Sequence, residues 1–461
     1  MKRLVTLLLL LSVAAFALVA CGGEEAPPAE EVIDTETVTT TAPAEEPVTE
    51  EATLPPPVVD DVPTPTLAPG APGGDEQEPE AQPEEPLQPE AEPETDGGAD
   101  EGVVFPWPED RFGYGIQIHG NATVGDPVAT MDAVANQLGL DWIKVQVEWP
   151  AVHPSPDAEQ WFIYDGVMDQ AFNYGVNVML SVVGAPAWTR ASGTENGPPD
   201  DYAGYYAFLE ELLTRYEGKV QAIEVWNEQN LDREWQTGSG LVPAQYVEFL
   251  SGAYETIKAH NSDIIVISDA LSPTGVHDGI TVYDDFLYMD GLLEAGLLDY
   301  TDCVGAHHNG YNIGPDVAFD QTGSAPDAAT ASFRGPFDNP HHSWSFKTTL
   351  DTYAEKVRAI DPEMKLCITE FGWASSEGYD APPEGFGFAA DNTLEEQATY
   401  IVDAYQQMRE SGYVWLTFLF NFDYGNKSGG PSNDNVPYSI IDVNGVPRPA
   451  FGAISAMEKT P

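Results

Sequence analysis

Basic residues are scarce in this sequence. Its 461 residues include 18 lysines and arginines against 76 aspartates and glutamates, which gives a formal net charge of −58 at pH 7. A chain this acidic repels phosphate backbones, so nucleic acid is not an expected partner. The expected ligand is neutral, or at least not a polyanion. A saline habitat would favour the same composition.

Cysteine is also scarce, with Cys21, Cys303 and Cys367 as its three occurrences. Two thiols in the folded part of such a chain do not make the disulfide framework of a small secreted domain. Cys303 and Cys367 each lie in an apolar, strand-like run. This favours two buried free thiols, and a bridge between them is the alternative.

Long apolar runs are absent after the N-terminus, so no membrane span of roughly 20 residues is expected there. Residues 1–20 themselves read as a secretory signal: Met1-Lys-Arg3 is basic, and Leu4 to Val19 is apolar. The signal ends in Leu18-Val-Ala-Cys21, which resembles a bacterial lipobox. That resemblance implies cleavage before Cys21, lipid attachment to its sulfur and a location at the outer face of the membrane. The alternative is an ordinary signal peptide with an incidental cysteine.

Residues 21–102 have the composition of a linker. Residues 22–102 contain no lysine or arginine, hold 24 acidic residues and are rich in proline, glutamate and threonine. Such a segment cannot bury enough apolar surface to fold, and its charges repel one another. We expect a disordered stalk that carries the folded domain, residues 103–461, away from the lipid anchor. That domain has a formal charge of −36.

Within residues 103–461, strand-like and helix-like segments alternate. The expected strands are 113–119, 141–149, 176–183, 220–226, 264–268, 302–307, 365–370 and 414–420. The expected helices are 126–138, 164–174, 202–216, 243–260, 286–298, 344–360, 394–410 and 449–457. Eight strand–helix pairs predict the α/β class and a closed (β/α)₈ barrel of TIM type. An open doubly wound sheet is the competing fold, but no Gly-x-Gly-x-x-Gly follows the first strand.

Two carboxylic acids end expected strands of this barrel. Glu228 follows the fourth strand in Val225-Trp-Asn-Glu228, and Glu370 ends the seventh in Leu366-Cys-Ile-Thr-Glu370. Barrel strands point their C-terminal ends into one mouth, so both groups should face the same substrate. A pair of carboxyl groups flanking a glycosidic bond is the machinery of sugar hydrolysis.

Trp226-Asn-Glu-Gln-Asn230 together with Thr369-Glu-Phe-Gly372 resembles the clan A glycoside hydrolases, and among them the cellulase-family and family 39-like members. The resemblance covers residues 103–461. It implies that Glu228 is the acid/base, that Glu370 is the nucleophile and that Asn227 holds the sugar 2-hydroxyl. The mechanism would be retaining, without a cofactor. Trp226 and the charge of Glu370 should raise the pKa of Glu228.

The sequence departs from that family at three points. Gln229 stands where proline is usual after the acid/base. The second strand offers Lys144, Gln146 and Glu148 where an arginine often contacts the nucleophile. The eighth strand offers Phe420 where a tryptophan platform is usual. These changes put the substrate in question but leave both carboxylates in place.

The resemblance suggests further site residues. His307 ends the sixth strand and Tyr311 follows it, near the point where clan members often place a histidine and a tyrosine. His119, on the first strand, is either a wall residue or a ligand contact. Adjacent histidines point in different directions and no zinc motif is present, so no metal is expected. We expect Trp188 and Trp373 to line the cleft, because indole packs on the apolar face of a sugar.

These observations predict a monomeric, lipid-anchored, retaining β-glycosidase that acts on a neutral polysaccharide or oligosaccharide at the bacterial cell surface. A glycan-binding lipoprotein without turnover is the alternative from another class. A transglycosylase of the same fold would differ only in its products.

Overall fold

The computed structural model of this protein describes residues 103–460. The predicted signal peptide, the stalk and Cys21 lie outside these residues. Eight strands form one sheet. They are β1 (Gly113–Gln117), β2 (Trp142–Glu148), β3 (Asn177–Val183), β4 (Ala222–Val225), β5 (Ile265–Ser268), β6 (Val304–Gly310), β7 (Leu366–Trp373) and β8 (Val414–Leu419).

All neighbouring strands are parallel, in the order β5-β4-β3-β2-β1-β8-β7-β6. The two end strands meet through parallel bridges from Ile267 to Cys303 and from Leu271 to Ala306, which close the sheet into a barrel. The predicted (β/α)₈ fold is therefore confirmed, and the open doubly wound sheet is excluded.

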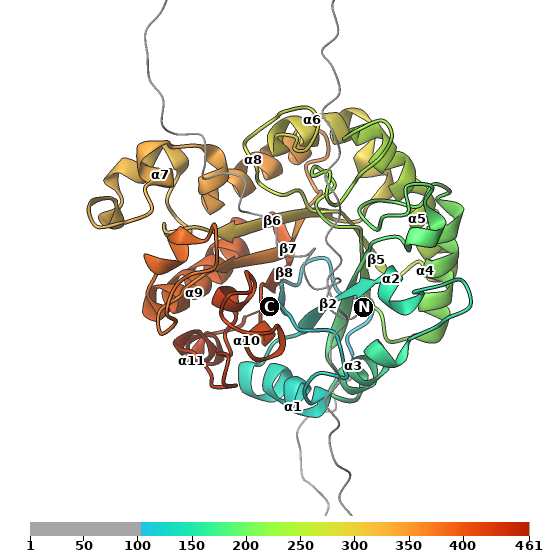
Figure 1. Cartoon of the computed structure of the whole chain (residues 1–461), viewed down its shortest axis with the longest axis horizontal. Helices are drawn as coiled ribbons and strands as arrows, with labels where there is room; N and C mark the ends of the chain where they lie inside the picture. Colours follow the sequence, from blue (N-terminus) through green and yellow to red (C-terminus); the bar gives the residue numbers. More distant parts are fainter. Residues whose placement is uncertain (1–102, 461) are drawn as a thin grey trace, which may run out of the picture. The chain divides into compact units, whose positions relative to one another are not determined.

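Helices surround the barrel, and the chain passes once around it (Figure 1). The α-helices are α1 (Pro127–Asp132), α2 (Trp149–Val152), α3 (Phe162–Asn173), α4 (Ala203–Arg215), α5 (Pro243–His260), α6 (Asp285–Glu294), α7 (Gly335–Asp338), α8 (Phe346–Arg358), α9 (Leu394–Ser411), α10 (Tyr424–Lys427) and α11 (Pro449–Ala456). A π-helical turn, Ala133–Leu138, continues α1. None of the helices within residues 103–460 has both the length and the hydropathy that crossing a membrane requires.

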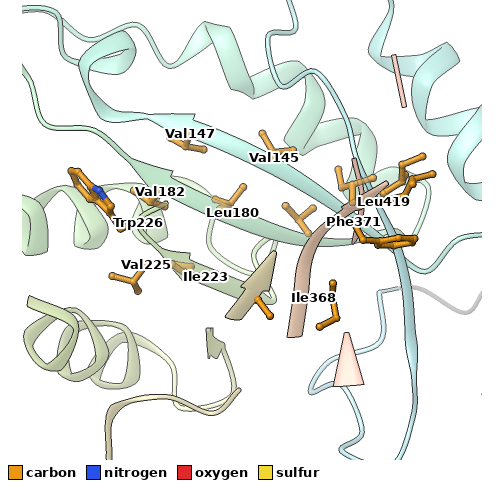
Figure 2. Close-up of a cluster of buried hydrophobic side chains, with 14 of the residues drawn as sticks. Val145, Val147, Leu180, Val182, Ile223, Val225, Trp226, Ile368, Phe371 and Leu419 are labelled. Atoms are coloured by element: carbon orange, nitrogen blue, oxygen red, sulfur yellow. The ribbon is translucent and has the colours of Figure 1, made fainter. Parts of the chain in front are cut away.

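Side-chain alternation along the strands divides the molecule into two layers. One set of alternate positions packs outward against the helices. Figure 2 shows this set on β2, β3 and β4, with Val145 and Val147, Leu180 and Val182, and Ile223 and Val225. The other set points inward. Its apolar members form a cluster inside the barrel that includes Trp142, Met179, Ala222, Ile267 and Phe418. Polar residues follow them inside the barrel, and these build the site.

Cys303 and Cys367 form a disulfide, with their Cα atoms 5.8 Å apart. The preference for two free thiols was wrong. Both side chains belong to the inward-facing apolar cluster, and they come from neighbouring strands, because Cys367 pairs with Gly305 in the sheet. The Cα separation lies within the range that a disulfide spans.

The segment between β6 and α8 is the longest excursion from the barrel. The structure organises it with short helices, 3₁₀ turns at Phe319–Ser324, Pro326–Ala329 and His342–Trp344, and α7 between the last two. Further 3₁₀ turns lie at Ala187–Thr189, Leu297–Tyr300, Gly387–Ala390 and Val436–Tyr438. The β6–α8 segment contributes Tyr311 and Ser343 to the cavity described below.

Candidate active site

A cavity of about 670 Å³ opens at the C-terminal ends of the strands. Its wall comes from strand ends all around the barrel, including Gln117 of β1, Gln146 of β2 and His307 of β6. The structure brings seven of the predicted site residues together there. They are His119, Asn227, Glu228, His307, Tyr311, Glu370 and Phe420.

Glu228 lies in a tight turn directly after β4. Its φ is 48°, and that of Trp226 is 89°, both in a region that residues other than glycine rarely adopt. The buried carboxylate of Asp269, directly after β5, holds this turn: its Oδ1 accepts from the N–H of Glu228 at 2.9 Å, and its Oδ2 accepts from the N–H of Gln229 at 3.0 Å. The second donor exists because Gln229, unlike the proline that the resemblance in sequence implies at this position, has a backbone N–H.

Burial, followed by the charge of Glu224, raises the pKa of Asp269 well above its usual value. Sequence reasoning missed Asp269. The available signal was an acidic residue placed directly after an apolar strand, the same signal that identified Glu228.

The carboxylate of Glu228 has two basic partners. His307 Nδ1 lies 3.3 Å from its Oε1, and Arg233 Nη2 donates to its Oε2 at 2.9 Å. Burial raises the pKa of Glu228, but the hydrogen bond with His307 and the charge of Arg233 outweigh it and lower the pKa to about 2. The expected upward shift was therefore wrong for this state of the site. Trp226 does not supply the expected desolvation either, because it packs with Trp235 and Phe249 in the outer core.

Glu370 is held from β2. Lys144, fully buried inside the barrel, donates through Nζ to Glu370 Oε1 at 3.1 Å. Asn309 Nδ2 lies 3.4 Å from Oε2 of the same carboxylate. Lys144 thus makes the contact that the resemblance gives to an arginine.

A third glutamate lies between these groups. Glu224, fully buried on β4, places Oε2 3.2 Å from Lys144 Nζ and Oε1 3.8 Å from His307 Nε2. Burial lowers the pKa of His307, but the charge of Glu370 and the hydrogen bond with Glu228 outweigh it and raise the pKa above 6.5. Acidic and basic side chains therefore alternate in space along the series Glu370, Lys144, Glu224, His307 and Glu228.

The cavity wall combines aromatic rings with acidic side chains. Tyr311, Phe386, Phe388, Phe420 and Tyr438 belong to one cluster of packed rings. The acidic side chains that line the cavity besides Glu228 and Glu370 are Glu148, Glu234 and Asp434. Burial, partly offset by Arg233, raises the pKa of Glu234 to about 7, and burial raises that of Asp434 to about 6. Rings and acidic groups together suit a ligand with both apolar faces and hydroxyl groups.

The structure places the two predicted tryptophans elsewhere. Trp188 is 45% exposed, and its Nε1 donates to the carbonyl of His153. Trp373 is fully buried and packs on Phe346 of α8 and Tyr400 of α9. It faces the helices because it lies three residues after the inward-facing Glu370, on the other side of the strand. Neither residue lines the cavity.

Two clusters in the described part of the chain have metal-ligand chemistry, Asp284 with His341 and His342, and His153 with Glu159 and Glu211. Neither includes Glu228 or Glu370. Both ring nitrogens of His153 are engaged, by Trp149 Nε1 and by Glu211. His341 Nδ1 accepts from the N–H of Ser343, and His342 Nε2 faces the Asp285 carboxylate. Hydrogen bonding accounts for both groups.

No protein-family model and no curated protein matches this chain. Solved structures do. A family 39 glycoside hydrolase of Bacteroides cellulosilyticus is similar over 77% of this chain at 18% identity, with a TM-score of 0.53, and this chain spans 64% of that enzyme. A glucosidase of Croceicoccus marinus matches over 75% of this chain and 67% of its own, at 15% identity and a TM-score of 0.51. The β-glycosidase BGL167 matches over 76% of this chain and 96% of its own, at 13% identity and the same TM-score. The folded part of this chain therefore has the (β/α)₈ barrel fold of glycoside hydrolases, among them a member of family 39.

Proposed function

We propose that this protein is a retaining O-glycoside hydrolase that cleaves β-glycosidic bonds of a neutral polysaccharide or oligosaccharide. The observation that carries the proposal is the placement of Glu228 and Glu370. Glu228 follows β4 and Glu370 lies on β7, and both carboxylates line one cavity. Glu370 contacts Lys144 and Glu228 contacts His307, so the two carboxylates stand at the two ends of one buried series of charged side chains. A retaining mechanism needs such a pair about 5–5.5 Å apart.

In the first step, the Glu370 carboxylate attacks the anomeric carbon while the bond to the leaving oxygen breaks and Glu228 delivers a proton to that oxygen. Lys144 Nζ lies 3.1 Å from Oε1 of the carboxylate that makes this attack. In the second step, Glu228 accepts a proton from water, whose oxygen displaces Glu370 from the sugar. Asn227, at the same strand tip and in the cavity wall, is the proposed partner of the sugar 2-hydroxyl.

The low pKa of Glu228 has a consequence for the proton it delivers. Glu228 and His307 interact closely, so they titrate as a pair that shares one proton. The ring holds this proton in the free site, because the pKa of His307 is raised and that of Glu228 is lowered. As negative charge develops on the leaving oxygen, the proton passes through Glu228 to that oxygen. Activity should therefore fall on the alkaline side as the pair loses its proton.

The test uses an aryl β-glycoside with a very acidic phenol, in the presence of azide. Glu228→Ala should still form the glycosyl-enzyme, because this leaving group needs no proton, and should give the β-glycosyl azide. Glu370→Ala should give the α-azide or no product. Glu363→Ala removes an exposed glutamate outside the cavity and should behave as wild type. If Glu228→Ala gave the α-azide and Glu370→Ala gave the β-azide, the roles of the two glutamates would be reversed. If both variants kept full activity, the reaction would not take place at this site.

A glycan-binding protein without turnover is the second candidate. Two observations favour it: Arg233 pairs with Glu228 in the free site, and Gln229 replaces the usual proline. Turnover of any aryl β-glycoside that is lost in Glu370→Ala would exclude this candidate. Binding of an oligosaccharide without turnover, in the wild type as in Glu370→Ala, would support it.

We also propose that the domain is exported and tethered through lipid on Cys21. The signal-like residues 1–20 and the acidic stalk support this, and the Cys303–Cys367 disulfide is typical of an oxidising compartment. Cys21→Ser should release the protein or leave it unprocessed. Wild-type protein found free in the medium, with Cys21 unmodified by mass spectrometry, would contradict the anchor. Deletion of 22–102 should leave activity on small substrates intact.

A further inference from the structure

Glu224 has no part in the two-carboxylate mechanism, yet it lies inside the barrel between the groups that serve it. We propose that Glu224 is a positioning residue that holds Lys144 and His307 in place and thereby sets the pH at which the Glu228–His307 pair loses its proton. The inference rests on the proposed function and assigns a role to a third carboxyl group of the same site.

The geometry joins four strands through one side chain. Glu224 projects from β4 and lies 3.2 Å from the ammonium of Lys144 on β2, which in turn lies 3.1 Å from Glu370 on β7. Its other oxygen lies 3.8 Å from Nε2 of His307 on β6, whose Nδ1 lies 3.3 Å from Glu228. Lys144 and His307 each stand between Glu224 and one candidate catalytic glutamate.

Glu224 makes its polar contacts with two basic side chains, Lys144 and His307. Within the described residues, neither of its carboxylate oxygens has a hydrogen-bond partner of good geometry, so the ion pairs with Lys144 and His307 are its polar contacts. A buried arrangement of this kind is poor evidence for a stabilising role, because well-packed apolar residues of the same volume often give equal or greater stability. Its placement against both groups of the reaction favours a role in function.

The other titratable groups around Glu224 do not replace it. Asp269, at the end of β5, and Tyr205 and Tyr246, on α4 and α5, have pKa values raised chiefly by burial. Both oxygens of Asp269 accept from backbone N–H groups and neither contacts His307 or Lys144. Arg233 contacts Glu228 and Glu234. Three carboxyl groups therefore act on the ring of His307: Glu228 faces Nδ1, Glu224 faces Nε2, and Glu370 adds a charge that raises the pKa of the ring.

The expected consequences have definite signs. Removing the charge of Glu224 takes away an anion that favours the protonated imidazole, so the Glu228–His307 pair should lose its proton at lower pH. The alkaline limb of the pH profile of kcat/KM should therefore move in the acidic direction, and so should the titration midpoint of the His307 ring.

The test is Glu224→Gln, which keeps the shape of the side chain and removes its charge. We expect the alkaline limb of kcat/KM to move by about one pH unit or more, since a nearby unit charge in a buried site shifts an ionisation by that order. The matched control is Asp285→Asn. Asp285 is also fully buried and pairs with a histidine, His342 at 3.1 Å, but it does not line the cavity. The pH profile of kcat/KM for Asp285→Asn should be the same as that of the wild type.

A readout that needs no turnover separates this inference from the proposed function. The ring protons of His307, assigned by comparison with His307→Gln, can be titrated by NMR. In Glu224→Gln the midpoint should fall, whether or not the protein is a hydrolase. A folded Glu224→Gln protein with an unmoved alkaline limb and an unmoved His307 midpoint would overturn the proposal. If Glu224→Gln does not fold, Glu224→Asp, which keeps the charge but retracts it, should lower the midpoint by a smaller amount, and an unchanged midpoint there would equally overturn it.

Discussion

Lys144 Nζ lies 3.1 Å from Glu370 Oε1 in the closed interior of the barrel. The lysine is fully buried and meets a second carboxylate, Glu224, at 3.2 Å. An ammonium is a compact point charge, so it can pair with both carboxylates where the planar fork of an arginine would need more room. Lys144 therefore supplies the positive charge of the arginine that the resemblance implies, although the geometry of its contacts differs.

Lys144→Met should weaken both the reaction and the fold. The variant leaves two buried carboxylates without their cation, which costs about 3–5 kcal/mol in the free energy of unfolding. The value of kcat/KM should also fall, because Glu370 loses the ammonium group that contacts its Oε1. Urea unfolding and steady-state kinetics measure the two effects. Lys356→Met, which breaks a surface pair with Asp290, should cost at most about 1 kcal/mol and leave kcat/KM unchanged.

Asp269→Asn should misplace Glu228. The carboxylate accepts from two backbone N–H groups, whereas an asparagine presents one oxygen and turns its amide N–H₂ toward the second donor. We expect a loss of about 1–3 kcal/mol in stability and a fall in kcat that exceeds the rise in KM. Asp263→Asn changes an exposed aspartate before β5 and should have neither effect. Wild-type kinetics in Asp269→Asn would show that the turn holds Glu228 without this acceptor.

Phe420→Ala should weaken binding of the sugar in the transition state. The ring is 8% exposed, lines the cavity and packs on Tyr424 and Tyr438. We expect kcat/KM to fall about tenfold or more, which corresponds to 1.4 kcal/mol of transition-state binding. Phe172→Ala removes a half-exposed ring from α3 and serves as the control. Unchanged kinetics in folded Phe420→Ala would mean that the sugar does not contact this ring.

Replacing both Cys303 and Cys367 by serine should destabilise the fold without moving the site. The bridge closes a loop between residues 64 positions apart, for which the chain-entropy estimate is about 4 kcal/mol. Urea unfolding of the variant, and of wild type with and without a reductant, measures this difference. Equal midpoints in all these samples would contradict a stabilising bridge. The pH profile should not change, because both sulfurs lie in the apolar cluster below the charged residues.

The sequence was sufficient for the fold and for the convergence of Glu228 and Glu370 on one cavity, because both rest on local signals. Eight alternating strand–helix pairs favour a barrel, and Glu228 and Glu370 end two of the strand-like runs. The partners of these glutamates were predictable only in part. Lys144 was one of three residues that the second strand offered in place of an arginine, and His307 was a predicted site residue. Glu224 and Asp269 are lone polar residues within or just after apolar strands, and their contacts join different strands.

Counting along a strand would have corrected one expectation. From the inward-facing Glu370, alternation places Phe371 outward, Gly372 inward and Trp373 outward, against the helices. The low pKa of Glu228 could not be foreseen from Trp226, because Arg233 and His307 reach the carboxylate through the turn after β4 and from β6.

The Cys303–Cys367 bridge also determines how the protein would respond to proteolysis. A protease that cuts once in the segment between β6 and α8 would divide the chain into a piece with Glu228 and a piece with Glu370. Cys303 lies before that segment and Cys367 lies after it. The two pieces would therefore stay covalently joined beside each other in the sheet, and only a reducing agent would separate them on a gel.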